Sequence, residues 1–321
     1  MEYKIEAIVV THNRKILLQE CLQALEKQTY SLYKIIVVDN ASSDGTIEML
    51  KALKEVYKVP LDILQLNKNI GGSGGFYEGM KYARDSHDAD YVWIMDDDTI
   101  PEHDALEYLI NAAKLFVKNA NSSEKASYFV STAFAENHKD CMNVPELDTK
   151  LDDNGYPSWT RYLKYGLVKT TTATFVSIMF PIDVLDTCGL PVRDFFIWCD
   201  DTEYTLRLQK YYGSGYLVGK SKVIHKRLKS KSLSLATEEN QSRIKMYYYL
   251  YRNRCICDLV YRCQKNKYNY FLICLRNIFP LLFMPLGWLK FKIAYKGIFN
   301  GCFKNNVLID FINSQINSKK L

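Results

Sequence analysis

Three consecutive aspartates, Asp96, Asp97 and Asp98, directly follow the apolar stretch YVWIM. Adjacent carboxylates repel one another unless a cation compensates their charge. Because alternate residues at a strand end point the same way, Asp96 and Asp98 can converge on one ion. Their oxygens suit Mg²⁺ or Mn²⁺, which can bridge two phosphates and stabilise a departing diphosphate as a Lewis acid. The alternative is an acidic turn that caps a helix beginning near Pro101.

A glycine-rich segment, NIGGSGGF, spans residues 69–76. Glycines allow the backbone to approach a ligand closely, and the helix expected from Phe76 would offer N–H groups to an anion. The spacing matches neither the phosphate-binding loop of nucleoside triphosphatases nor the dinucleotide-binding fingerprint. A flexible loop without a ligand is the alternative interpretation.

A second pair of adjacent acids, Asp200 and Asp201, follows the aromatic run FFIW. A carboxylate at this place can act as a general base that removes a proton from an acceptor hydroxyl. In the alternative, Asp200 or Asp201 caps the following helix and Glu203 completes a capping box. Both interpretations can hold together. His225 ends the strand-like segment GYLVGKSKVIH, and it is either structural or, as a neutral imidazole, a third metal ligand.

These residues need elements that bring them together, and the first hundred residues alternate between strand and helix patterns. Short β-branched runs predict buried strands, and apolar residues at helical spacing predict helices between them. The expected strands cover residues 5–10, 34–38, 61–66 and 91–95, and the expected helices lie within 11–25, 46–57 and 76–83. Such alternation implies parallel strands in an open α/β sheet that binds ligands at their carboxyl ends. Polar clusters follow all four strands, at residues 11–14, 39–44, 67–75 and 96–98.

The rest of the chain is expected to end in helices. We predict loops and short strands at 120–165, a strand pair at 169–181, and helices at 183–189, 203–211 and beyond Glu238. The apolar segment 272–289 is interrupted by Arg276, Pro280 and Pro285. Since a spanning helix needs about 20 uninterrupted apolar residues, this segment predicts a kinked helical hairpin at a membrane surface, or a helix pair packed on the rest of the chain. The predicted domains are a catalytic domain, 1–237, and a helical, membrane-associating region, 238–321.

The charge, aromatic and cysteine content indicate which partners and which cellular location the protein has. The net charge of +6 comes from 42 basic and 36 acidic residues, with no strongly basic segment before residue 200, which argues against nucleic acid as a partner. Basic residues in HKRLKSKS and at Lys319 and Lys320, with many late aromatic residues, fit a surface that meets lipid headgroups. The nine cysteines lack zinc or disulfide spacing. Because the chain opens on a strand pattern without a leader, we expect a cytoplasmic protein on the inner face of the plasma membrane. The protein could form a homo-oligomer.

Taken in order and spacing, the segments VVTHNR, IIVVDNASSDGT, NIGGSGGF, MDDD and WCDDTEYTLR resemble the inverting family 2 glycosyltransferases. That family has the nucleotide-diphospho-sugar transferase fold, called GT-A, which is an open, mostly parallel sheet with flanking helices. The glycine segment, the triple aspartate, FFIWCDD and the late histidine are most similar to galactofuranosyltransferases of bacterial cell-wall and polysaccharide assembly. Rhamnosyltransferases are near relatives. The resemblance covers about residues 5–255, to which a C-terminal helical appendage is added.

The resemblance implies a role for each matching residue. A nucleotide-diphospho-sugar donor would be bordered by Thr11, Asn13, Arg14, Asp39, Asn69, Gly71, Gly72, Asp96 and Asp97. Mn²⁺ or Mg²⁺ would be held by Asp96, Asp98 and His225. Asp201 would be the catalytic base, and Trp198 and Asp200 would face the acceptor. One departure concerns the acceptor contact, because the family often has a lysine or similar residue before its Trp-Asp-Asp triplet, whereas Cys199 here separates Trp198 from Asp200.

The function that this resemblance implies is transfer of a hexosyl residue with inversion. The first candidate donor is UDP-galactofuranose, and the acceptor would be a sugar hydroxyl of a lipid-linked molecule or polysaccharide. A rhamnosyltransferase that uses dTDP-rhamnose is the alternative within the class. A nucleotidyltransferase would normally carry a basic, glycine-rich loop near its first strand, which THNRKIL lacks. A non-catalytic module that binds nucleotide sugars or glycans would leave Asp201 without a task.

Overall fold

The computed structural model describes residues 2–121, 124–137, 139–142, 145–226, 234–262 and 266–317, with side chains up to residue 314. Lys319, Lys320 and all but the first two residues of the HKRLKSKS segment lie outside the described residues. The strands are β1 (Ile5–Thr11), β2 (Lys34–Asp39), β3 (Leu61–Gln65), β4 (Tyr91–Asp96), β5 (Thr99–Pro101), β6 (Ala126–Phe134), β7 (Cys141–Met142), β8 (Glu146–Leu147), β9 (Leu167–Thr172), β10 (Ile178–Pro181) and β11 (Ser214–His225). The α-helices are α1 (Lys15–Glu26), α2 (Thr46–Lys54), α3 (Gly71–Ser86), α4 (Ala105–Asn119), α5 (Ile182–Cys188), α6 (Asp200–Tyr211), α7 (Gln241–Tyr261), α8 (Lys267–Ile278), α9 (Gly287–Phe303) and α10 (Asn306–Asn317).

The described strands form one sheet in the order β3-β2-β1-β4-β10-β6-β11-β9-β8, with β5 against β11 and β7 against β6. Strands β3, β2, β1 and β4 are parallel. Strand β10 is antiparallel to both β4 and β6, and β11 is parallel to β6, so β11 points the same way as β4. The carboxyl ends of β1, β2, β4 and β11 therefore lie along one edge. The predicted open, mostly parallel α/β sheet is confirmed.

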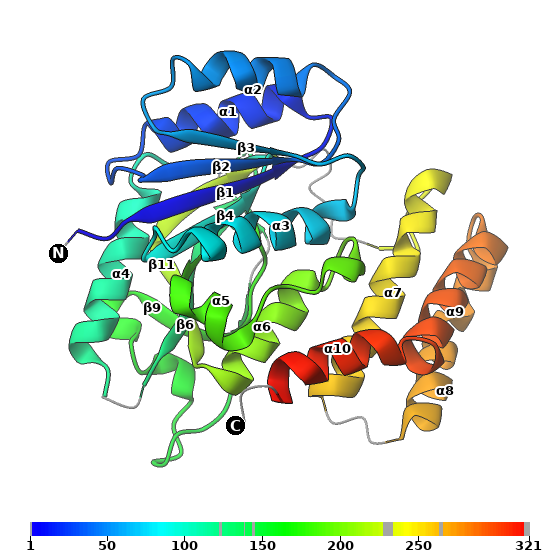
Figure 1. Cartoon of the computed structure of the whole chain (residues 1–321). Coiled ribbons are helices and arrows are strands. Elements are labelled where there is room, and N and C mark those ends of the chain that lie inside the picture. The colour runs from blue at the N-terminus through cyan, green and yellow to red at the C-terminus, as the bar shows by residue number, and fades with distance from the viewer. Residues whose placement is uncertain are drawn as a thin grey trace.

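Both faces of the sheet are covered because side chains alternate along its strands. In β1, Ile5, Ala7 and Val9 belong to the core that includes the buried faces of α1 and α4, whereas Ile8 and Val10 belong to the core with α3, α5 and α6. Figure 1 shows α1 and α2 on one side of the sheet and α3, α5 and α6 on the other. Two covered faces explain why the central strands have continuous apolar sequences.

The C-terminal helices α7, α8, α9 and α10 lie together beside the sheet domain, on the side of α6 (Figure 1). Apolar residues of α7, α8 and α9 form a core of their own, and a smaller cluster joins α7 and α10 to Val192 and Phe195. The short 3-10 turn η4 (Phe279–Phe283) and Pro285 separate α8 from α9, as expected of a kinked hairpin. Across the described ranges, every helix is too short or too polar to cross a bilayer. Membrane contact and the boundary at residue 237 stay predictions.

Four local expectations are corrected. The glycine segment is the first turns of α3, which begins at Gly71 instead of Phe76. Residues 126–134, expected as loops or short strands, form the central strand β6, because they pair with β10 and β11 and bury apolar side chains on both faces of the sheet. The two strands within 169–181 do not pair with each other, since β9 pairs with β11 and β10 with β4. Helix α6 begins at Asp200 instead of Glu203.

Candidate active site

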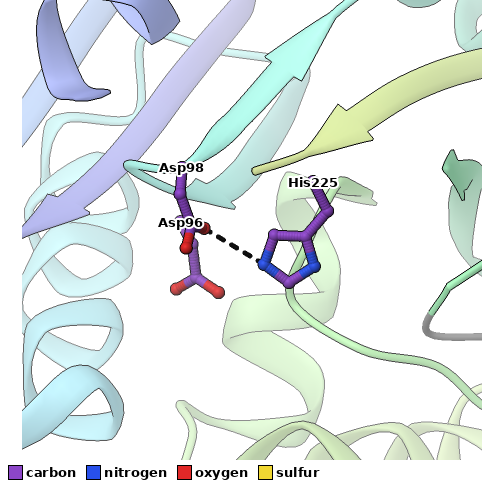
Figure 2. Close-up of side chains that lie close together, drawn as sticks. All are labelled: Asp96, Asp98 and His225. Atoms are coloured by element: carbon purple, nitrogen blue, oxygen red, sulfur yellow. Dashed lines mark ion pairs between the residues drawn. The ribbon is translucent and has the colours of Figure 1, made fainter. Parts of the chain in front are cut away.

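The side chains of Asp96, Asp98 and His225 converge at the carboxyl ends of β4 and β11 (Figure 2). Their potential ligand atoms all lie within 4.8 Å of one another, and His225 Nε2 lies 3.1 Å from Asp98 Oδ1. Asp98 and His225 are buried, whereas Asp96 is half-buried. Two carboxylates suit Mg²⁺ or Mn²⁺, and a neutral imidazole is a ligand that a transition metal such as Mn²⁺ accepts. The chemistry of this donor set fits the expected ion.

Strand pairing explains how His225 reaches the aspartates. After Asp98 the chain enters β5, which pairs antiparallel with the end of β11, so that Thr99 lies opposite His225. The backbone N–H of Lys226 also donates a hydrogen bond to the carbonyl oxygen of Asp98 at 2.8 Å. The histidine is therefore fixed beside the aspartates by backbone contacts, independently of its side chain.

Asp97 points away from this cluster and joins β4 to the end of β1. Thr11 Oγ1 donates to Asp97 Oδ2 at 2.7 Å. Arg14 Nη1 lies 3.1 Å from Asp97 Oδ1 and 2.8 Å from Asp98 Oδ2. Since both Asp97 oxygens are engaged within the protein, this residue supports the cluster from behind.

Charge within the cluster is only partly compensated. Burial and the charges of Asp98 and Asp97 hold the pKa of Asp96 well above its ordinary value. Burial raises the pKa of Asp97 to about 6 against the opposing charge of Arg14. Burial acts on Asp98 too, but His225 and Arg14 outweigh it, so the pKa of Asp98 is lowered. Three carboxylates beside one arginine leave an excess of negative charge, which a divalent cation would compensate.

The end of β2 and the segment before α3 form the neighbouring part of the edge. Asp39 is buried; its Oδ1 accepts from the N–H of Ser42 at 3.1 Å, while its Oδ2 has no partner among the described residues. Asn40 holds the turn into α3, since its Oδ1 accepts from the N–H of Ile70 at 2.9 Å and its Nδ2 donates to the carbonyl of Gly71 at 2.9 Å. Sequence reasoning missed Asn40, although it lies in the DNASSDG cluster.

Two further predicted residues shape the backbone near the edge. Asn13 is exposed, with a φ of 53°, and its Oδ1 accepts from the N–H of Ser43 at 2.7 Å. Asn69 Oδ1 accepts from the N–H of Gly71 at 2.8 Å, at the start of α3. Both side chains order the loops that surround the carboxyl ends of β1 and β3.

Most glycines of residues 69–76 serve packing. A Cβ on Gly75 would lie 2.4 Å from Val10 Cγ1, so this glycine lets α3 approach β1 closely. A Cβ on Gly71, whose φ is +79°, would lie 2.0 Å from the carbonyl oxygen of Phe196. Gly72 has no atom within 4 Å of its Cβ position and lines the cavity described below. Of these three, only Gly72 is open to a ligand.

Asp200 and Asp201 begin α6. Asp200 is buried and Asp201 is half-buried, and Asp201 Oδ1 accepts from the N–H of Thr202 at 2.6 Å. Burial, with the charge of Asp201, raises the pKa of Asp200 to about 7, and burial raises the pKa of Asp201 to about 6. Within the described chain, neither carboxylate forms an ion pair with a basic side chain. A carboxylate that titrates near neutrality suits a general base.

The turn before these acids has an unusual backbone. Phe196, Trp198 and Cys199 have φ values of 67°, 63° and 66°, a region that residues other than glycine rarely adopt and that costs about 1–3 kcal/mol per residue. Asn253 and Arg252 of α7 donate hydrogen bonds to carbonyl groups of this turn. No pattern in the sequence indicated these contacts.

Glu203 has a structural role. The expected capping box does not form, because Cys199 is the N-cap and no side chain caps the helix. Glu203 is fully buried, and its carboxylate pairs with Arg207 at 2.5 Å and accepts from the hydroxyl of Tyr261 at 2.5 Å. This network links α6 to α7 and engages Glu203 within the protein. Asp200 and Asp201 are the acids in the first turn of α6 that line the cavity described below.

One cavity of about 760 Å³ has both acidic clusters on its walls. Its volume is in the range of pockets that bind small molecules. The lining includes Arg14, Gly72, Ser73, Asp96, Asp98, Phe175, Trp198, Asp200, Asp201, His225 and, from α7, Arg243, Met246, Leu250 and Arg254. Six of the residues predicted to border the donor do not line this cavity in the described part of the chain. They are Thr11, Asn13, Asp39, Asn69, Gly71 and Asp97. A candidate cation site and a candidate base thus line the same cavity.

Comparison with known proteins identifies the sheet domain. Residues 6–157 match the family model of glycosyl transferase family 2. The chain is 38% identical to the galactofuranosyltransferase GlfT1 of Mycolicibacterium smegmatis over 211 residues, which are 63% of this chain and 64% of that protein. It is 32% identical to the abequosyltransferase RfbV of Salmonella typhimurium over 103 residues, which are 32% of this chain and 30% of that protein. The aligned parts span less than two thirds of each relative.

Solved structures share the fold over most of the chain. S. aureus TarS (residues 1–349) is 16% identical, with a TM-score of 0.56 over 97% of this chain and 87% of that one. GalNAc-T7, solved with UDP, GalNAc and Mn²⁺, is 12% identical, with a TM-score of 0.62 over 95% of this chain and 57% of that one. At such low identity these likenesses concern the fold alone. Residues 6–157 therefore carry a family 2 glycosyltransferase domain, and the chain shares the GT-A fold of these structures.

Proposed function

We propose that this chain is an inverting, metal-dependent glycosyltransferase that moves a hexosyl residue onto a sugar hydroxyl. The observation that carries the proposal is the placement of two acidic clusters on one cavity, Asp96 and Asp98 with His225 on β4 and β11, and Asp200 with Asp201 on α6. The first cluster has the composition of a cation site, and the second contains carboxylates with raised pKa values. The family 2 domain supports the same class of reaction.

The chain's own residues would bind the donor at the carboxyl edge of the sheet. Asp96, Asp98 and His225 would hold Mn²⁺ or Mg²⁺, which supplies Lewis-acid stabilisation of a departing diphosphate when bound. Asp39 Oδ2, buried and without a partner in the described chain, would accept an N–H of the nucleotide base. The other residues proposed to border the donor are Thr11, Asn13, Arg14, Asn69, Gly71, Gly72 and Asp97.

Asp201 would act as the base. Its carboxylate takes the proton of the acceptor hydroxyl while that oxygen forms a bond to the anomeric carbon. The bond from this carbon to the diphosphate oxygen breaks, and its electrons leave with the nucleoside diphosphate. Attack from the face opposite the leaving group inverts the anomeric configuration. Trp198 and Asp200, which line the same cavity, would orient the acceptor.

UDP-galactofuranose is the first candidate donor because of the similarity to GlfT1, and dTDP-rhamnose or another UDP-hexose is the second. The proposed acceptor is lipid-linked or a polysaccharide, and it would be met at a membrane surface on the cytoplasmic side. Exposed apolar side chains near η4 and the start of α9 support this surface, with exposed fractions of 81% for Phe283 and 72% for Trp288. Lys292 and Lys296 follow on α9 and would favour anionic headgroups.

A screen of nucleotide sugars tests the proposal. The full chain is incubated with UDP-galactofuranose, dTDP-rhamnose, UDP-glucose and UDP-N-acetylglucosamine, each with Mn²⁺ and a series of glycoside acceptors. We expect one donor to give a Mn²⁺-dependent product with inverted anomeric configuration by NMR. A chain that neither transfers nor hydrolyses any of these donors would contradict the proposed function.

A further inference from the structure

We infer that Asn253, on α7, is a positioning residue that sets the catalytic carboxylates in place by holding the turn formed by residues 195–199. This inference rests on the proposed function, because it assumes that Asp201 is the base. It adds a residue from the C-terminal helices to the machinery of the sheet domain. Asn253 itself is buried behind the turn and does not line the cavity.

The turn needs an external support. Phe196, Trp198 and Cys199 all have left-handed φ values, and residues 195–199 contain no glycine. Side chains with a Cβ rarely adopt this conformation, and it persists only where surrounding contacts impose it. Asp200 follows Cys199 directly, so relaxation of the turn would move both carboxylates at the start of α6.

Asn253 supplies that support through one amide group. Its Nδ2 donates to the carbonyl oxygens of Phe195 at 3.0 Å, Ile197 at 3.2 Å and Trp198 at 2.8 Å. Asn253 and Phe195 have no exposed surface, so no water can replace the amide at the carbonyl of Phe195. An unsatisfied buried carbonyl is costly, and the three contacts therefore select the observed backbone.

Arg252 orients the amide. Its Nε donates to Asn253 Oδ1 at 2.8 Å, which turns the Nδ2 end towards the carbonyl groups. Its Nη2 donates to the carbonyl oxygens of Asp194 at 2.7 Å and Phe195 at 3.2 Å. Two adjacent residues of α7 thus hold five carbonyl contacts along residues 194–198.

The opposite side of the turn rests on the wall proposed for the donor. The N–H of Ser73 donates to the carbonyl of Phe196 at 3.2 Å, and Ser73 Oγ donates to the carbonyl of Val192 at 2.7 Å. Gly71 gives this backbone the room to approach α3. The turn is therefore fixed between α3, beside the donor, and α7. This placement sets the distance of Asp201 from the sugar.

The test compares Asn253→Ala with the matched control Asn300→Ala. Asn300, on α9, also makes an amide contact within the helical unit, since its Nδ2 donates to the hydroxyl of Tyr248 at 2.9 Å, but it does not touch the turn. Because displacement of a reacting group by about 1 Å can cost about 100-fold in rate, we expect N253A to lower kcat by about 10- to 100-fold. The KM for the donor and the Kd for UDP with Mn²⁺ should stay within about twofold, because the hydrogen bonds of Asn253 go to Arg252 and to the turn, and not to the residues proposed to border the donor.

The control and a second variant keep the inference falsifiable. N300A should keep kcat within about twofold even if it lowers Tm by as much as N253A. Should N253A fail to fold, Arg252→Lys, which loses the contact that orients the amide, should lower kcat in the same selective way. A kcat of N253A and of R252K within twofold of the unaltered chain would overturn the inference, as would equal losses in N253A and N300A.

Hydrogen exchange separates this inference from the proposed function. Protection of the amides in residues 195–203 should fall in N253A and not in N300A, whatever the enzyme transfers. If the unaltered chain turned over no donor, the proposed function would fail while the exchange experiment still tested the support of the turn. Unchanged protection in N253A would overturn the support itself.

Discussion

The cavity has two acidic clusters that differ in how their charge is balanced. Asp96, Asp97 and Asp98 lie beside Arg14 and His225, and every member is held by strand pairing or by a short contact within the sheet domain. Asp200 and Asp201 have no basic partner in the described chain, and their pKa values are raised to about 7 and about 6. Adjacent aspartates of the same type are therefore placed in two different electrostatic environments.

Each arrangement suits one task. The negative charge of the first cluster exceeds the positive charge of its neighbours, and its residues are fixed at strand ends. Such an arrangement is suited to bind a cation and a diphosphate. A pair of carboxylates that titrates near neutrality is suited to exchange a proton. In the proposed function, the environment of each cluster, and not the residue type, separates cation binding from base catalysis.

The largest effect is expected at the first cluster. Asp98→Ala should remove the gain in UDP affinity that Mn²⁺ gives and leave no measurable turnover, because it deletes a proposed metal ligand and removes the contacts that Asp98 makes with Arg14 and His225. Calorimetry of UDP binding with and without Mn²⁺ measures this. Asp153→Ala, at an exposed carboxylate, is the control. Unchanged Mn²⁺-dependent affinity in D98A would refute the assignment of this cluster.

The second cluster should respond in the opposite way. Asp201→Asn should lower turnover by about 100-fold or more, because the amide cannot accept the proton. UDP binding with Mn²⁺ should stay at the level of the unaltered chain. Initial rates under saturating donor, together with calorimetry, check the two halves of this prediction. Near-normal turnover in D201N would show that another group is the base.

Activity should depend on pH through the same cluster. The pKa of Asp201 is raised to about 6 by burial, so the carboxylate is mostly ionised at pH 7 and takes up a proton as the pH falls. Because the base acts when ionised, kcat should fall about tenfold per pH unit well below that pKa. A profile of kcat at saturating donor between pH 5 and pH 8 measures it. A flat profile across that interval would count against a carboxylate base.

The smallest effect is expected from a pair of glycines at the start of α3. Gly75→Ala should lower the free energy of unfolding by about 1–3 kcal/mol, since its Cβ would lie 2.4 Å from Val10 Cγ1. Gly72→Ala should not destabilise the chain, because its Cβ position is open. Urea unfolding of both variants makes the comparison. Equal destabilisation would mean that the glycines do not divide between packing and the cavity.

The sheet could be predicted from the sequence because its signals are local. The apolar runs at residues 5–10, 34–38, 61–66 and 91–95 match β1, β2, β3 and β4 to within a residue at each end. Parallel pairing then brings Asp39 and Asp96 to one edge. Strand β6 could not be predicted in the same way, since it lies within a polar, turn-rich stretch and pairs with strands that lie far along the chain.

The site could be predicted only in part. Asp96, Asp98 and His225 were expected together from a family resemblance, but the pairing of β5 with β11 that joins them has no local signal. Asn253 supports residues that precede it by more than fifty positions, and no periodicity or spacing reveals such a contact. Long-range hydrogen bonds to strained backbone are therefore the part of the site that requires a structure.

We expect a single divalent cation to bind at the first cluster and not at the second. Anomalous diffraction at the manganese edge, from a crystal grown with UDP and Mn²⁺, tests it most directly. We predict one manganese peak among Asp96, Asp98 and His225, in contact with the diphosphate of UDP. A bound UDP without manganese at these three residues, or a peak at Asp200 and Asp201 instead, would contradict the account.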